Sequence, residues 1–290
     1  MKNACCKLAV MALLALVVTA TTTATAQFRK IAPEAVRKQV EVSMLLTGTI
    51  DIERDGSVSG YVLDQREKVP DYVTTLLDRR VAAWQFEPTV RDGQPVAVRS
   101  PMSVRMVARP TEDDRFEISI SGTSFDGEYS GAATDYVTGD RLDPPAYPMA
   151  AIRMGGQGTV YLMLRIGRDG RVGDLFVEQV NLTAIGREAE MAKMREQLSK
   201  AAVDAAWKWT FHPPTTGEAI GEDSWAVRVP VEFDNYDNKA PGYGKWQPYL
   251  PGQRRTATWA QDDASPDTVA GGGVHPVGDG VKLLTPLQEG

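Results

Sequence analysis

One short pattern occurs twice in this chain, as Trp84-Gln85-Phe86-Glu87-Pro88 and again as Trp209-Thr210-Phe211-His212-Pro213. Each copy ends a helix-like stretch and is followed by a glycine, Gly93 in the first case and Gly217 in the second. Before each copy stand two hydrophobic runs separated by an Asp-Gly pair, a pattern that is typical of a β-hairpin. The repetition predicts an α+β fold of two tandem modules, each a small antiparallel β-sheet packed against helices.

In the first module, hydrophobic runs at residues 42–52 and 58–63 flank Asp55-Gly56, which predicts a hairpin. A helix is expected to begin at Pro70, because apolar residues then recur at helical spacing. These residues are Val73, Leu76, Leu77, Val81 and Trp84. A second turn at residues 92–93 predicts that a strand over 96–108 pairs back into the sheet, with Pro101 at an edge or a bulge.

The second module repeats this order of elements. Strands over 158–166 and 172–180 flank Asp169-Gly170, and a helix is expected over 184–207 with Thr183 as its N-cap. The helix has an apolar stripe made of Met191, Met194, Leu198, Ala202, Ala205 and Trp209.

The changes in composition along the chain predict five parts. We expect residues 27–109 to form the first module and residues 143–234 the second. Residues 110–142 between them are expected to be a linker with one extra strand at 116–120. Residues 235–290 are rich in Pro, Gly and Asp, so we expect a partly disordered tail.

The remaining part, residues 1–26, has the features of a cleavable signal peptide. Lys2 and Lys7 precede an apolar run at 8–18, and Ala24-Thr25-Ala26 provides a small-residue cleavage pattern. Export to the periplasm is therefore expected, with a mature chain that begins at Gln27. The alternative is a retained inner-membrane anchor, although the apolar run is shorter than the roughly 20 residues that span a bilayer.

The composition argues against catalysis and against nucleic acid as a partner. The formal net charge of -6 disfavours binding to phosphate backbones. Both cysteines lie in the leader, and His212 and His275 are the only histidines, so the usual zinc sites and cysteine nucleophiles cannot be built. The nearest approach to a serine-hydrolase turn, at residues 122–126, lacks the second glycine. We expect no metal, no cofactor and no enzymatic activity.

The second module combines short elements that occur together in one protein family. They are Pro145-Ala146-Tyr147-Pro148, Gly155, Gly158, Asp169-Gly170-Arg171-Val172, Trp209-x-Phe211-x-Pro213, Gly217 and Val227-x-Val229-Pro230-Val231-x-Phe233. With these elements, residues 143–234 resemble the C-terminal domain of the TonB energy transducers. Residues 42–109 resemble a degenerate copy, which keeps the Asp-Gly turn and the Trp-x-Phe-x-Pro element but lacks the Pro-x-Tyr-Pro element.

The resemblance implies a three-stranded sheet backed by helices, whose last strand accepts an extended segment of an outer-membrane receptor by strand addition. The strand over 225–234 is then expected to be an edge with unpaired backbone groups. The residues that the resemblance assigns to contact with the bound segment are Pro145, Tyr147 and Pro148, and those assigned to pairing with it are Ala226, Arg228 and Val231.

The leader bears on how such a module would work. A transducer that transmits force needs a retained membrane helix and a long Pro-rich arm, whereas this sequence has a leader of the cleavable type and no such arm. The sequence thus favours a non-enzymatic periplasmic module that binds envelope proteins or receptor segments through a sheet edge. Two alternatives stay open: a membrane-anchored TonB-type energy transducer that serves outer-membrane receptors, and an envelope enzyme with a cleft between the modules.

Overall fold

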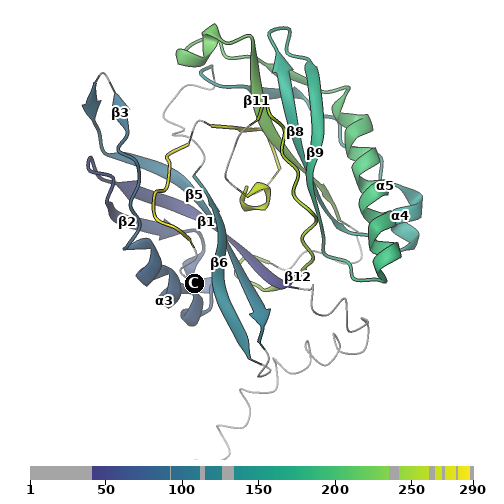
Figure 1. The fold of residues 1–290 in the computed structure, drawn as a ribbon, viewed down its shortest axis with the longest axis horizontal. Coiled ribbons are helices and arrows are strands. Elements are labelled where there is room, and N and C mark those ends of the chain that lie inside the picture. Colours follow the sequence, from purple (N-terminus) through teal and green to yellow (C-terminus); the bar gives the residue numbers. More distant parts are fainter. Residues whose placement is uncertain are drawn as a thin grey trace, which may run out of the picture.

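The computed structural model describes residues 41–91, 93–111, 115–125, 134–234, 242–260, 265–269, 272–278 and 280–287. The fold is α+β and consists of two modules whose sheets face each other, with the helices on the outer sides (Figure 1). The expected leader and its cleavage site lie outside the described residues. Within those residues, no helix has both the length and the apolar character needed to cross a bilayer.

The first module is built around a long central strand, β1. Its elements are β1 (Glu41–Ile52), β2 (Val58–Leu63), η1 (Arg66–Lys68), α3 (Asp71–Val81), β3 (Val90–Arg91), β4 (Gln94–Pro95) and β5 (Val98–Pro110). Strand β1 pairs antiparallel with β2 on one side and with β5 on the other. The hairpin predicted at Asp55-Gly56 is confirmed, and so is the return of the last long strand into the sheet. Pro101 pairs with Thr49 of β1 in the part of β5 that precedes its pairing with β6.

A further strand, β6 (Phe116–Ser124), pairs with β5 from Ser103 to Pro110. The extra strand predicted at 116–120 is therefore confirmed. It lies in the first sheet, which extends past the expected module boundary at residue 109. Ile120 is buried in the first core and Ile118 packs against that core, which explains why the strand docks there.

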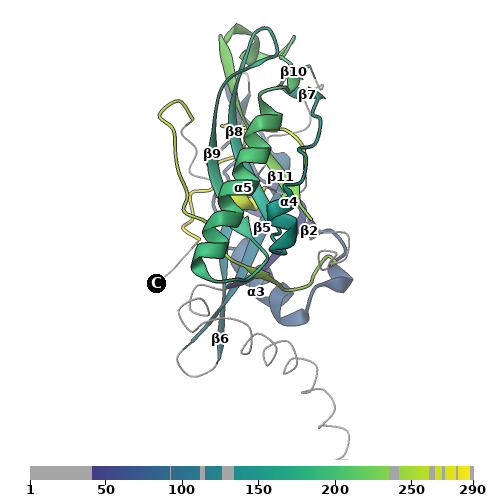
Figure 2. The ribbon, with the colours of Figure 1, turned by 90° about the vertical axis from the view of Figure 1, so that its right-hand side faces the viewer.

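The second module repeats the order of two strands, a helix and a returning strand that β1, β2, α3 and β5 show in the first, within a longer set of elements. They are β7 (Thr138–Arg141), α4 (Met149–Arg153), β8 (Gly158–Gly167), β9 (Val172–Leu182), α5 (Glu188–Ala206), β10 (Thr210–His212), η2 (Glu218–Gly221) and β11 (Ser224–Phe233). Strand β8 is central and pairs antiparallel with β9 and β11. Both α4 and α5 lie over the outer side of this sheet, in front of its strands in Figure 2.

Helix α5 begins later than the sequence predicted. The expected N-cap, Thr183, still follows the sheet, because its backbone N–H donates to the carbonyl oxygen of Gln157 at 3.0 Å. The observed N-cap is Arg187, whose backbone N–H donates to the Glu190 carboxylate at 2.9 Å in a capping box. The cap prediction at Thr183 is therefore wrong, while the apolar stripe is confirmed at Met191, Met194, Leu198 and Ala202.

Within each module, the Asp-Gly turn contacts the Trp-x-Phe element in the same way. The backbone N–H of Phe86 donates to the carbonyl oxygen of Gly56 at 2.8 Å, and Phe211 donates to Gly170 at the same distance. In both turns the aspartate side chain accepts a bond from the backbone N–H two residues later, at 3.0 Å from Ser57 and 3.1 Å from Arg171. Both phenylalanines are buried, in two separate cores. The turn is thus tied to the end of the helix in the same way in each module.

The C-terminal tail passes repeatedly between the two modules. It contributes β12 (Gln247–Tyr249), η3 (Pro266–Thr268) and β13 (His275–Pro276). Strand β12 pairs with the start of β1, and the next residue, Leu250, bridges to Leu182 at the end of β9. Residues 282–284 then bond to the backbone of Gln85 and Glu87 in the first module. These described parts of the tail, drawn in yellow-green to yellow in Figure 1, lie between the sheets and along their edges.

A buried polar network joins the modules through the tail. Arg105 of β5 donates from Nε to the carbonyl oxygen of Asp267 at 2.6 Å, and from a terminal nitrogen to Ser43 at 3.0 Å. The hydroxyl of Tyr249 donates to the Asp267 carboxylate and accepts a bond from Asn181 of β9 at 3.1 Å. Burial raises the pKa of Asp267, although the nearby Arg105 opposes this shift. One alternative from the sequence was a cleft between the modules. At this position, the described residues Arg105, Asn181, Tyr249 and Asp267 are buried and bonded to one another.

Candidate partner-binding site

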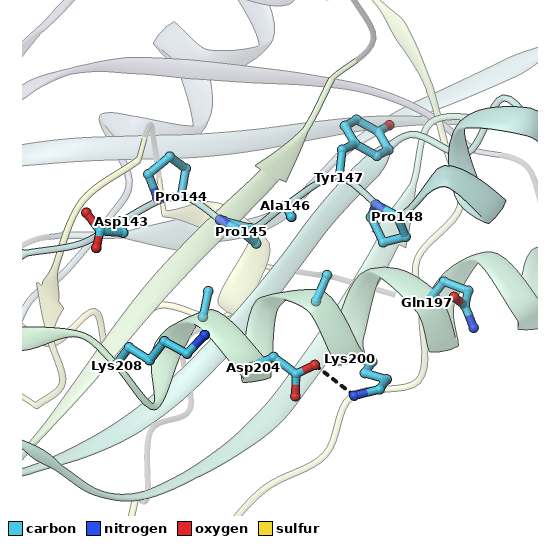
Figure 3. Close-up of a pocket in the computed structure, with 12 residues that line it drawn as sticks. Asp143, Pro144, Pro145, Ala146, Tyr147, Pro148, Gln197, Lys200, Asp204 and Lys208 are labelled. Atoms are coloured by element: carbon cyan, nitrogen blue, oxygen red, sulfur yellow. Dashed lines mark hydrogen bonds and ion pairs between the residues drawn. The ribbon is translucent and has the colours of Figure 1, made fainter.

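Residues 143–148 run alongside helix α5 and form a groove of about 470 Å³ with it (Figure 3). All three residues of the predicted Pro-x-Tyr-Pro contact set line this groove. The lining consists of Asp143, Pro144, Pro145, Ala146, Tyr147, Pro148, Gln197, Lys200, Ala201, Asp204, Ala205 and Lys208. Its walls are thus prolines and alanines with a few charged groups, among them the ion pair of Lys200 and Asp204 at 2.7 Å.

Tyr147 fastens the Pro-rich segment to the end of strand β11. Its ring packs edge-on against Phe233, with ring centroids 5.4 Å apart. Its hydroxyl lies within bonding distance of two carbonyl oxygens, that of Gly156 and that of Phe233 at 3.3 Å. Burial, followed by the charge of Asp234, raises the pKa of the Tyr147 hydroxyl. In Figure 3 the tyrosine points away from α5.

The other end of the segment is held by the repeated tryptophan. The indole Nε1 of Trp209 donates to the carbonyl oxygen of Asp143 at 2.8 Å. Only 4% of Trp209 is exposed, whereas Asp143, whose carbonyl oxygen accepts the bond, is exposed. We did not predict this role from the sequence, which showed only that a tryptophan with a polar N–H ends the helix. A buried indole N–H needs an acceptor, and that requirement is the signal that could have indicated a partner.

Strand β11 pairs with β8 along its whole length, from Ser224 to Phe233. Its other edge meets β13, where Val227 lies opposite Pro276 and Arg228 opposite His275. The backbone N–H of Val277 donates to the carbonyl oxygen of Ala226 at 3.1 Å. The prediction of unpaired backbone groups along all of 225–234 is therefore wrong for residues 226–228. The strand from Val229 to Phe233 has β8 as its neighbour among the described strands.

The regular register of β11 shows which backbone groups face the β13 side. In an antiparallel ladder, alternate residues direct their N–H and C=O groups to opposite neighbours. Because the carbonyl of Ala226 faces β13 and the pairing with β8 has no bulge, Arg228, Pro230 and Glu232 face that side too. Pro230 lacks an N–H, and this position costs the β8 ladder nothing. The backbone of Val231 faces β8, and its side chain lies in the second core.

Arg228 has a structural partner for its side chain. Its guanidinium makes two bonds to the carboxylate of Glu178, at 2.7 and 2.9 Å. Both side chains are almost completely buried, and Arg254 from the tail approaches the same carboxylate at 3.3 Å. Of the residues assigned to pairing, Ala226 and Arg228 direct their backbone groups to the side where β13 already pairs with the strand, and the Arg228 charge is also used within the chain.

The chain is similar to curated bacterial proteins over part of its length. It is 35% identical to Protein TonB of Xanthomonas campestris pv. campestris over 105 residues, which is 36% of this chain and 40% of that protein. It is 36% identical to Protein tonB2 of Pseudomonas aeruginosa over 89 residues, which is 31% of this chain and 28% of that protein. The chain thus spans less than half of either relative. No family model matches it, and no solved structure does.

Proposed function

We propose that this chain, which contains a TonB C-terminal-like domain, is a non-enzymatic binding protein of the periplasm. It binds extended segments of envelope proteins, including outer-membrane receptors, by adding them to the edge of β11. The observation that carries the proposal is that β11 is the last long strand on this side of the second sheet and already accepts a short antiparallel strand, β13, there. Backbone bonds of this kind give affinity with little demand on the partner's sequence.

The groove beside α5 supports the same assignment. Tyr147 connects the groove to the end of β11, because it lines the groove and also contacts Phe233. Next to it, Met149 leaves 61% of its surface exposed. Exposed apolar groups are a common feature of surfaces that bind other proteins. A segment bound to the edge at Val229–Phe233 would reach the end of β11, where Tyr147 contacts Phe233.

The first module is, in this proposal, a diverged second copy of the same domain. The topology, the Asp-Gly turn and the bond from the phenylalanine N–H to the turn glycine are the same in both modules. Strand β5 holds the position that β11 holds in the second module, and β6 covers the edge of β5 over eight residue pairs. That edge is therefore closed, and the first module acts as a support for the second.

A proline at Glu232 should weaken partner binding without unfolding the protein. The Glu232 N–H faces the open edge, so its loss removes one bond to an added strand and leaves the β8 ladder intact. We expect the Glu232→Pro variant to bind peptides copied from N-terminal receptor segments about tenfold more weakly. Fluorescence anisotropy with the full chain measures this. Glu232→Ala keeps the N–H and serves as the control; equal binding by both variants would exclude strand addition at this edge.

A membrane-anchored energy transducer is the second candidate, and the similarity to proteins named TonB favours it. Mass spectrometry of the N-terminus, combined with cell fractionation, separates the two. A soluble periplasmic chain that begins at Gln27 supports the binding protein. An intact N-terminus in the inner-membrane fraction supports the transducer instead.

A further inference from the structure

We infer that residues 274–277 of the tail are a resident ligand of β11, bound where a partner segment would add. The inference rests on the proposed function for the identity of what displaces these residues. Their pairing with β11 can be tested on the chain alone. The sequence of this resident segment, Val274-His275-Pro276-Val277, also specifies the chemistry of the segment that replaces it.

The segment pairs with β11 as an added strand would. His275 lies opposite Arg228 and Pro276 opposite Val227, in antiparallel register. Because Val277 donates its N–H to Ala226 at 3.1 Å, alternation places Pro276 at a position that makes no ladder bonds. The missing N–H of the proline therefore costs nothing at this point in the register. The tail sequence is thus compatible with its position along the β11 edge.

Side chains of the segment also contact the second module. Val274 packs against the second core, and its Cγ2 lies close to Gly139 of β7, where an added Cβ would be only 3.4 Å away. His275 is 8% exposed and is therefore buried against β11. The contact combines backbone pairing with one apolar side chain in a defined position, which is how added strands obtain selectivity.

The pairing of β13 with β11 is much shorter than the pairing of β6 with β5, which covers the edge of the first sheet. Strand β6 covers β5 over eight residue pairs, whereas β13 covers β11 over two. A two-pair contact can be exchanged without disrupting a sheet, and local openings of this kind are the least costly in a folded protein. The β11 edge is therefore the exchangeable one, and β6 is a permanent part of the first sheet.

The tail is also anchored on both sides of the resident segment. Before it, Asp267 bonds to Arg105, and after it, Leu284 donates its backbone N–H to Gln85 at 2.8 Å. A tethered segment has a high effective concentration at its site. To displace residues 274–277, a competing segment must therefore bind β11 more tightly than a free peptide with the tail sequence does. The matching chemistry is an extended segment with a β-branched apolar residue in the Val274 position and, opposite Val227, a residue that, like Pro276, needs no ladder bond.

Hydrogen exchange of the full chain tests this inference. Val277→Pro removes the N–H that bonds to Ala226, and Val277→Ala keeps it as the matched control. We expect the amide of Arg228, which lies opposite His275, to exchange at least about tenfold faster in Val277→Pro than in the parent chain, with the Val277→Ala rate close to the parent. Unchanged rates in Val277→Pro would overturn the inference.

A synthetic peptide with the sequence of residues 272–278 gives the second measurement. It should bind Val277→Pro at least about tenfold more tightly than the parent chain, because the parent site is occupied, and it should restore slow exchange at Arg228. Equal affinity for both proteins would overturn the inference. Failure of the proposed function gives a different pattern, in which this peptide binds as expected and receptor-derived peptides bind neither protein.

Discussion

Replacing Gly170 by alanine is expected to lower the free energy of unfolding by about 2–5 kcal/mol. Gly170 has a φ of +72°, a backbone conformation that residues with a side chain adopt only with strain. A Cβ at this position would also lie 2.2 Å from the carbonyl oxygen of Phe211. The turn would have to move away, and the bond from the Phe211 N–H to the Gly170 oxygen would be lost. Urea denaturation of the full chain measures the change.

The same substitution at Gly56 should have a similar effect in the first module. Gly56 has a φ of +83°, and an added Cβ would meet the Phe86 carbonyl oxygen at 2.0 Å. Gly93 provides the control, because its φ is +75° and nothing lies within 4 Å of a Cβ placed there. Gly93→Ala should therefore cost only about 1–2 kcal/mol of backbone strain. If Gly170→Ala costs no more than Gly93→Ala, the contact between turn and helix end is absent in solution.

These turns also show why much of each module could be predicted from the sequence. A hairpin depends on a few adjacent residues, so Asp55-Gly56 and Asp169-Gly170 identify it without knowledge of the rest of the chain. The buried stripes of α3 and α5 follow from periodicity in the same way. The start of α5 was missed because Thr183 is held by a bond to Gln157, the residue just before β8. No local sequence pattern reveals this contact.

The roles of the tail could not be predicted because they depend on distant contacts. Its strands are only two or three residues long, too short for a period to be recognised, and they are bonded to residues far away in the sequence. The composition of residues 235–290 predicted partial disorder instead. The coverage of Ala226 and Arg228 by β13 followed from none of the motifs. The contact role of Pro145, Tyr147 and Pro148 was predicted only through the family resemblance, and the groove that they line was not predicted.

The pairing of Arg228 with the buried Glu178 was not predicted either, although the sequence contains one signal for it. Glu178 follows the apolar residues 175–177 of its strand, and Arg228 lies between two valines. Opposite charges inside two apolar strands of one sheet indicate an ion pair when both are buried. Their burial depends on the tail, since Arg254 and the backbone of Arg255 both bond to Glu178. Without the position of the tail, both side chains could have been solvated.

Replacing Glu178 by alanine is expected to destabilise the protein by about 3–5 kcal/mol, because it leaves the buried Arg228 guanidinium without its carboxylate. The two bonds between these side chains are 2.7 and 2.9 Å long, and both groups are shielded from water. Asp204→Asn is the control, because the Lys200–Asp204 pair is exposed and should contribute less than about 1 kcal/mol. Thermal and urea unfolding of the full chain measure both changes.

Removal of the positive partner should cost less than removal of Glu178. In an Arg228→Met variant, Arg254 remains near the Glu178 carboxylate, at 3.3 Å in the parent structure, so the remaining charge keeps a partner. When Glu178→Leu is combined with Arg228→Met, both buried charges are gone, and most of the lost stability should return. If the double variant is as unstable as Glu178→Ala, the loss comes from packing and the orphaned charge is not its cause. If Arg228→Met is the more damaging single change, the Arg254 side chain does not support the Glu178 carboxylate.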